Sequence, residues 1–155
     1  MPGYVGIVLG VMGLSAGLLV VFHLVGRRFR ASLGRTVAER FEPGQILRKD
    51  LWVEYFGRKR KGLAQLRGNG ALVLTDSRLW FYQAVPGTET AIPLGSVMRV
   101  STSMSHLSKT IFRPLLLVEF DCGEGPDSAA WAVSDTEGWM RDVETARGRV
   151  AAPEP

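Results

Sequence analysis

Four consecutive cations form the strongest chemical signal in this sequence: Arg58, Lys59, Arg60 and Lys61. They lie in the connection between two predicted strands, and basic runs of this kind are attracted to anionic membrane surfaces. Each cation near an anionic leaflet contributes about 1 kcal/mol, so four would contribute roughly 4 kcal/mol. We therefore predict that these residues contact lipid headgroups. A solvated loop that keeps the domain soluble is the alternative interpretation.

A second polar stretch, STSMSHLSK at 101–109, places serines close to His106 and Lys109. Nucleophilic catalysis needs an oriented base and an oxyanion site, and this stretch contains no G-x-S-x-G elbow. We expect a loop between strands, which is also suited to partner recognition. Cys122 is the only cysteine, so an internal disulfide is excluded. No His lies at the spacing from Cys122 that a metal site would need. The sequence thus predicts no catalytic residue, no metal, no cofactor and no enzymatic activity.

The chain that must position these residues begins with an uncharged segment. Residues 4–25 contain no Asp, Glu, Lys or Arg, and as a helix they would reach roughly 33 Å, enough to cross a hydrocarbon core about 30 Å thick. Basic residues follow on one side only: Arg27, Arg28, Arg30 and Arg35. This asymmetry predicts a transmembrane anchor over residues 1–26 of a single-pass protein in the cell inner membrane or plasma membrane. By the positive-inside rule, the N-terminus lies outside and the rest of the chain in the cytoplasm.

Four glycines recur on one face of this predicted helix, at Gly6, Gly10, Gly13 and Gly17. Such spacing allows close helix–helix approach, which predicts self-association or contact with another membrane helix. The alternative is that glycine is simply frequent in spanning helices.

The charge of the chain is unevenly distributed. Up to Lys61 there are eleven Lys and Arg against four acids, and beyond it eight against eleven. The basic half is therefore the membrane-proximal half, which favours an anionic lipid surface and argues against nucleic acid as the partner.

Residues 27–44 are predicted to form a basic amphipathic juxtamembrane linker. Apolar residues fall every four positions, at Phe29, Leu33, Val37 and Phe41, and Pro43 with Gly44 ends the pattern. Two interpretations remain open: the segment lies along the inner leaflet, or it is a stalk that packs against the domain.

Residues 45–150 read as a β domain with a C-terminal helix, followed by a disordered tail at 151–155. Seven or eight short strands are expected, at 51–56, 62–67, 71–75, 78–83, 90–94, 96–100, 115–120 and 129–133, with Gly68–Gly70 as a hairpin turn. Ser134 is the expected N-cap of the final helix, with Glu137 completing a capping box, and Trp139 closes the sheet. Among the aromatic residues of the strands, Phe81 and Trp131 are expected in the core. Others, such as Trp52, are candidates for an exposed aromatic patch.

The segments GALVLTDSRLWFY at 70–82 and IPLGSVMRV at 92–100, with a capping helix that carries Trp139, resemble GRAM and bacterial PH-like domains. The region is also similar to uncharacterised bacterial membrane proteins. The resemblance implies a mainly β fold, a PH-like curled antiparallel barrel closed by one helix on an N-terminal transmembrane helix. In PH domains that bind phosphoinositides, the loop matching Arg58–Lys61 holds the phosphate-binding residues.

Two functions follow from these expectations. In the first, the chain is a membrane-anchored, non-enzymatic binding module that contacts the anionic inner leaflet, a protein partner or both. In the second, it is a scaffold or assembly subunit that acts through helix–helix and sheet-edge contacts without recognising lipid.

Overall fold

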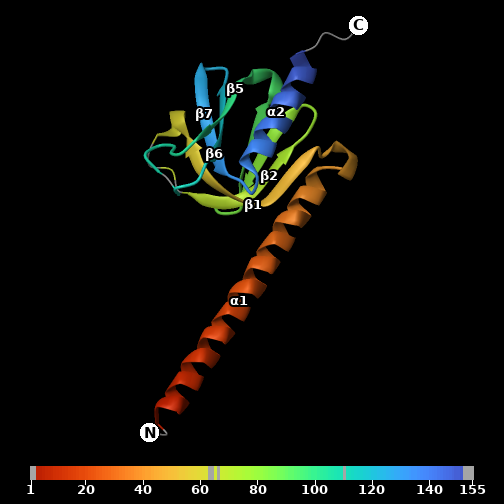
Figure 1. Cartoon of the computed structure of the whole chain (residues 1–155). Helices are drawn as coiled ribbons and strands as arrows, with labels where there is room; N and C mark the ends of the chain where they lie inside the picture. The colour runs from red at the N-terminus through yellow and green to blue at the C-terminus, as the bar shows by residue number, and fades with distance from the viewer. Residues whose placement is uncertain (1–2, 63–64, 66, 110, 152–155) are drawn as a thin grey trace.

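Two helices flank a single curled sheet (Figure 1). The computed structural model describes residues 3–62, 65, 67–109 and 111–151, and the side chains of these residues except those of 3–14 and 16. The helices and strands, in chain order, are α1 (Gly3–Arg40), β1 (Arg48–Arg58), β2 (Gly68–Leu74), β3 (Arg78–Gln83), β4 (Thr88–Pro93), β5 (Val97–Ser103), β6 (Leu115–Asp121), β7 (Pro126–Ala132) and α2 (Thr136–Ala151). Three short 3-10 turns connect them: η1 (Pro43–Gln45), η2 (Lys59–Lys61) and η3 (Leu94–Ser96).

The strands pair antiparallel in the order β4-β3-β2-β1-β7-β6-β5, so the first and seventh strands of the chain are neighbours. The main core lies inside the curl, where the rings of Tyr55, Phe81 and Trp131 meet at centroid distances of 4.8–5.9 Å. This confirms a seven-stranded antiparallel sheet and the placement of Phe81 and Trp131 in the core.

One predicted turn is wrong. Gly68, Asn69 and Gly70 do not reverse the chain but form the start of β2, where Gly70 pairs with Gln83 and Gly68 with Tyr55. A Cβ at Gly70 would overlap the carbonyl oxygen of Tyr82. The glycine is therefore needed for close approach between β2 and β3, which the sequence alone does not distinguish from a turn. The described members of the strand expected at 62–67 lie outside any strand.

The C-terminal helix α2 closes the core as expected, with Trp139, Val143 and Ala146 buried against β5, β6 and η3. Its N-cap, however, is Asp135, whose Oδ1 accepts a hydrogen bond of 3.0 Å from the Gly138 amide. Ser134 instead donates to Asp50 Oδ2 at 2.8 Å. The N-cap therefore lies one residue later than predicted, and Gly138, three residues after it, has no side chain to complete a capping box.

The segment expected as a linker continues the preceding segment as one helix, α1, which ends at Arg40, shortly before Pro43 and Gly44. Within the described side chains its apolar stretch runs from Gly17 to Gly26, about 15 Å of helix, which is half of a hydrocarbon core. In this described part of the chain, no helix combines the length and apolar character that crossing a membrane requires. The predicted transmembrane helix is therefore not supported there.

The rest of that predicted segment, together with Gly6, Gly10 and Gly13 of the glycine face, has side chains outside the described residues. At Gly17 a Cβ would meet no atom within 4 Å.

Candidate functional site

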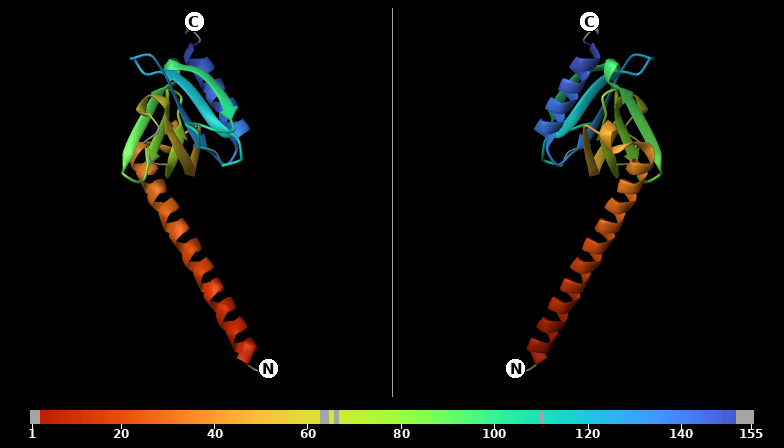
Figure 2. Two further views of the ribbon diagram at one scale, coloured as in Figure 1. Left: turned by 90° about the vertical axis from the view of Figure 1, so that its left-hand side faces the viewer. Right: turned by 90° about the vertical axis from the view of Figure 1, so that its right-hand side faces the viewer.

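The last third of α1 packs on the outer face of the sheet, opposite the main core. Leu33, Val37 and Phe41 are buried in a cluster with Ala71, Val73 and Trp80 from β2 and β3. The rings of Phe41 and Trp80 meet edge to face at 5.2 Å. Leu33, Val37 and Phe41 thus make the contact with the domain that the stalk interpretation of residues 27–44 expects. Both side views show the helix leaving the domain from this contact (Figure 2).

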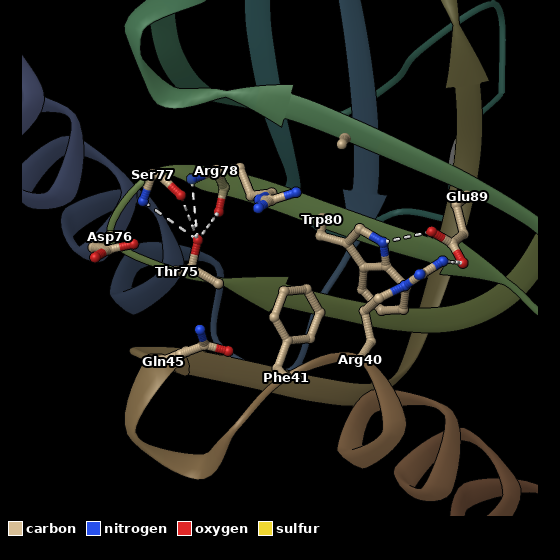
Figure 3. A pocket seen from close by; sticks show the side chains of 10 residues that line it. Arg40, Phe41, Gln45, Thr75, Asp76, Ser77, Arg78, Trp80 and Glu89 are labelled. Atoms are coloured by element: carbon tan, nitrogen blue, oxygen red, sulfur yellow. Dashed lines mark hydrogen bonds and ion pairs between the residues drawn. The ribbon is translucent and has the colours of Figure 1, made fainter.

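An ion pair and a hydrogen bond fix the end of this contact. Glu89 on β4 accepts from the guanidinium of Arg40, the last residue of α1, and from Trp80 Nε1 at 3.1 Å (Figure 3). The Arg40 hydrogen bond holds the pKa of Glu89 below its ordinary value, and the Trp80 bond acts in the same direction. The three residues line a cleft of about 360 Å³, whose remaining wall includes the Thr75–Arg78 turn. The orientation of α1 relative to the sheet is therefore set by packing and by polar contacts.

Further along α1, toward its N-terminus, Trp52 of β1 lies against the helix. Its ring meets Phe29 edge to face at 5.0 Å, and the Arg30 guanidinium lies 5.4 Å from its centre. Trp52 remains 40 % exposed. Beside this contact, a groove of about 190 Å³ lies between α1 and Trp52 of β1. It is lined by Phe22, His23, Gly26, Arg27, Arg30 and Trp52.

This groove lies where α1 changes from apolar to basic. The large apolar side chains from Leu18 to Val25 are 51–71 % exposed, so the domain does not cover them. Immediately after them, the four predicted basic residues Arg27, Arg28, Arg30 and Arg35 are all exposed, and no carboxylate pairs with them among the described residues. We call these four the α1 cluster.

The basic run at 58–61, which we call the loop cluster, is arranged differently. Asp127 of β7 has a fully buried side chain, and its carboxylate accepts from Arg58 Nε at 2.7 Å and from the Arg60 amide at 2.9 Å. Burial opposes the ionised form of Asp127, but the hydrogen bonds from Arg60, Arg58 and Ser128 outweigh it and lower its pKa. Arg58 also lies 5.2 Å over the Phe120 ring. The side chain of Arg58 is thus engaged in contacts within the domain that hold the loop in place.

Arg60 binds Glu124 in the β6–β7 turn, donating to its carbonyl at 2.9 Å and its carboxylate at 3.2 Å. That turn projects from the end of the domain where the C-terminus emerges, remote from the N-terminal end of α1 (Figure 2). Lys59 and Lys61 are exposed and have no ion pair within the described residues. A hollow of about 410 Å³ lies beside Lys61, lined by Arg58, Arg60, Lys61, Cys122 and Glu124. Lipid contact by this cluster stays a prediction.

The polar stretch 101–109 continues from β5 into a loop that folds back on β1. His106 is buried, with Nε2 3.1 Å from the Gly57 carbonyl, and burial lowers its pKa. Lys109 donates to the Gln65 carbonyl at 2.8 Å. Both side chains therefore hold the loop against the β1–β2 connection.

Comparison with known proteins identifies the architecture. No protein-family model and no curated protein matches the chain. Among solved structures, a chain of "The 8S snRNP Assembly Intermediate" is 12 % identical over 74 % of this chain and 89 % of its own length, with a TM-score of 0.55. The "Vps36 N-terminal PH domain" is 18 % identical over 71 % of this chain and 84 % of its own, with a TM-score of 0.51. The fold is PH-like. Identities this low show the fold of the PH-like domain alone, and the narrower resemblance to GRAM domains stays a prediction.

Proposed function

We propose that this chain is a non-enzymatic binding module whose PH-like domain is held against the inner face of the plasma membrane by α1. The proposal is carried by one observation: the exposed apolar residues of α1 end at a cluster of exposed arginines, beside the point where the domain docks. Apolar side chains are stabilised in lipid, by about 25 cal/mol per Å² removed from water, and arginines are stabilised at anionic headgroups.

The packing of α1 on the sheet also sets the orientation of the domain relative to the membrane. Because α1 is packed on the sheet through Leu33, Val37 and Phe41, the domain follows the tilt of the helix. The α1 cluster and Trp52 then lie nearest to a membrane that holds the Leu18–Val25 segment. The loop cluster lies against the β6–β7 turn, away from that membrane, and two of its four cations are engaged by Asp127 and Glu124. Even in contact with lipid, Lys59 and Lys61 would contribute roughly 2 kcal/mol rather than 4.

Fractionation of cells that express the full chain tests membrane attachment. We expect the chain in the membrane pellet after a high-salt wash and in the supernatant after detergent. Replacing Leu19, Phe22 and Val25 with serine should release it into the salt wash, since the apolar contribution is removed. Protease added outside intact cells should leave the domain uncut. A wild-type chain that stays in the supernatant after high-speed sedimentation would contradict the proposal.

A scaffold function is the second candidate, favoured by the edge strand β5. Met98 is 53 % exposed there, and Arg147 covers only part of the edge by donating to the carbonyls of Val97 and Met98. Met98→Lys should abolish a discrete crosslinked oligomer in native membranes, while Thr102→Lys, an exposed position on the same strand, should not. The same crosslinking pattern in both variants and the wild type would exclude this edge as the contact.

A further inference from the structure

The groove between α1 and β1 combines charge, an aromatic wall and open space. Arg27 and Arg30 are three positions apart, so both project from one side of the helix. Guanidinium groups bind phosphate through two parallel hydrogen bonds. Arg30 is additionally held by its contact with the Trp52 ring, 5.4 Å from its centre.

Gly26 keeps the groove open. It is one of the lining residues, and a Cβ built on it would meet no atom within 4 Å. A larger side chain at this position would therefore project into the groove without displacing protein atoms.

We propose that this groove binds the phosphate headgroup of an anionic phospholipid, an inference that rests on the membrane attachment proposed above. The arginines bind the phosphate, and Trp52 lies at the level of the headgroups, where tryptophan is favoured. The lipid is preferred over free phosphate because the groove runs directly into exposed apolar surface. Phe22 lines the groove and is 71 % exposed, so it is placed to contact the glycerol backbone and the first methylenes of an acyl chain.

Fluorescence of Trp52 provides the test in the full chain. The chain has four tryptophans, and the other three, Trp80, Trp131 and Trp139, are at most 2 % exposed, so quenching by lipid reports on Trp52. The chain is reconstituted in vesicles of phosphatidylcholine and phosphatidylglycerol, in which either lipid carries brominated acyl chains. At equal mole fraction, we expect quenching by brominated phosphatidylglycerol to indicate about a tenfold preference over phosphatidylcholine.

Two matched pairs of variants separate the groove from general basic charge. Arg27→Gln with Arg30→Gln should abolish the preference, while Arg28→Gln with Arg35→Gln, which removes the same charge outside the groove, should lower it much less. Gly26→Leu should lower the preference by filling the groove. Gly17→Leu, also without an atom within 4 Å of its Cβ, should not.

Equal quenching by both lipids, or equal effects of the two members of either pair, would overturn the inference while leaving membrane attachment intact. Release of the brominated lipid by soluble glycerol phosphate would show a site for free phosphate and would also overturn it. Failure of the wild-type chain to float with either kind of vesicle would overturn both the inference and the proposed function.

Discussion

The two groups of four cations in this chain have different roles although they look alike in sequence. In the loop cluster, Arg58 and Arg60 bind the buried Asp127 and the exposed Glu124. In the α1 cluster, all four arginines are exposed without a carboxylate partner among the described residues. In a run of basic residues, only the cations that have no carboxylate partner within the fold are available to bind an external anion.

The largest effect on stability is expected for Arg58→Ala. It leaves the carboxylate of Asp127 buried without its charged partner, at a cost of about 3 kcal/mol. Urea unfolding of the full chain in mild detergent, followed by tryptophan fluorescence, measures the loss. The matched change in the α1 cluster, Arg28→Ala, should shift the free energy of unfolding by less than about 0.5 kcal/mol. Equal losses in the two variants would remove the distinction between the clusters.

Leu33→Ala tests what holds the α1 cluster in place. This side chain is 2 % exposed between α1 and the sheet, and its truncation should cost about 2 kcal/mol. Amide hydrogen exchange at 29–40 should accelerate, while exchange in β6 and β7 stays slow, because the main core is on the other face of the sheet. Ala31→Ser, at an exposed position of the same helix, is the control. Unchanged exchange at 29–40 in Leu33→Ala would show that packing does not fix the helix.

Acid should weaken the loop cluster. The pKa of Asp127 is lowered on folding from an ordinary value of 3.8, so its contribution to stability is complete above that value. The contribution is lost as the pH falls from 3.8 through the lower, folded-state pKa. Unfolding free energy measured against pH should show this decline in the wild type, and Asp127→Asn should be less stable at neutral pH with a smaller decline. Parallel pH profiles for the two proteins would contradict the assignment.

The smallest effect is expected for Lys59→Ser with Lys61→Ser. Neither lysine has an ion pair within the described residues, so stability should change by less than about 0.5 kcal/mol. Binding to anionic vesicles should weaken less than in Arg27→Gln with Arg30→Gln. A larger loss of binding in the lysine variant would make the loop cluster the principal lipid contact.

The sequence predicted the elements whose signal is local. Seven of the eight expected strands overlap β1–β7. The helical spacing of Trp139, Val143 and Ala146 placed them in the core, and the four-residue spacing of Leu33, Val37 and Phe41 marked the buried side of α1. It misassigned Gly68–Gly70, because a glycine required by close strand approach and a glycine required by a turn have the same local pattern.

The candidate sites depended on partners distant in sequence. Asp127 lies 69 positions from Arg58, so nothing near the basic run indicated that half of it is paired. The groove was missed for the same reason, because it forms only when β1 brings Trp52 beside Phe29 and Arg30. The sequence offered one signal for this groove. Side chains alternate between the two faces of the strand LWVEYF, which places Trp52 on the outer face.

The central claim is that the α1 cluster, and not the loop cluster, faces the membrane. It is tested most directly by comparing two positions in the full chain bound to vesicles that carry a quencher on the lipid headgroups. Trp52 reports on the groove, and a fluorophore on the single cysteine, Cys122, reports on the hollow beside the loop cluster. We expect strong quenching of Trp52 and little quenching at Cys122. Stronger quenching at Cys122 than at Trp52 would contradict this orientation.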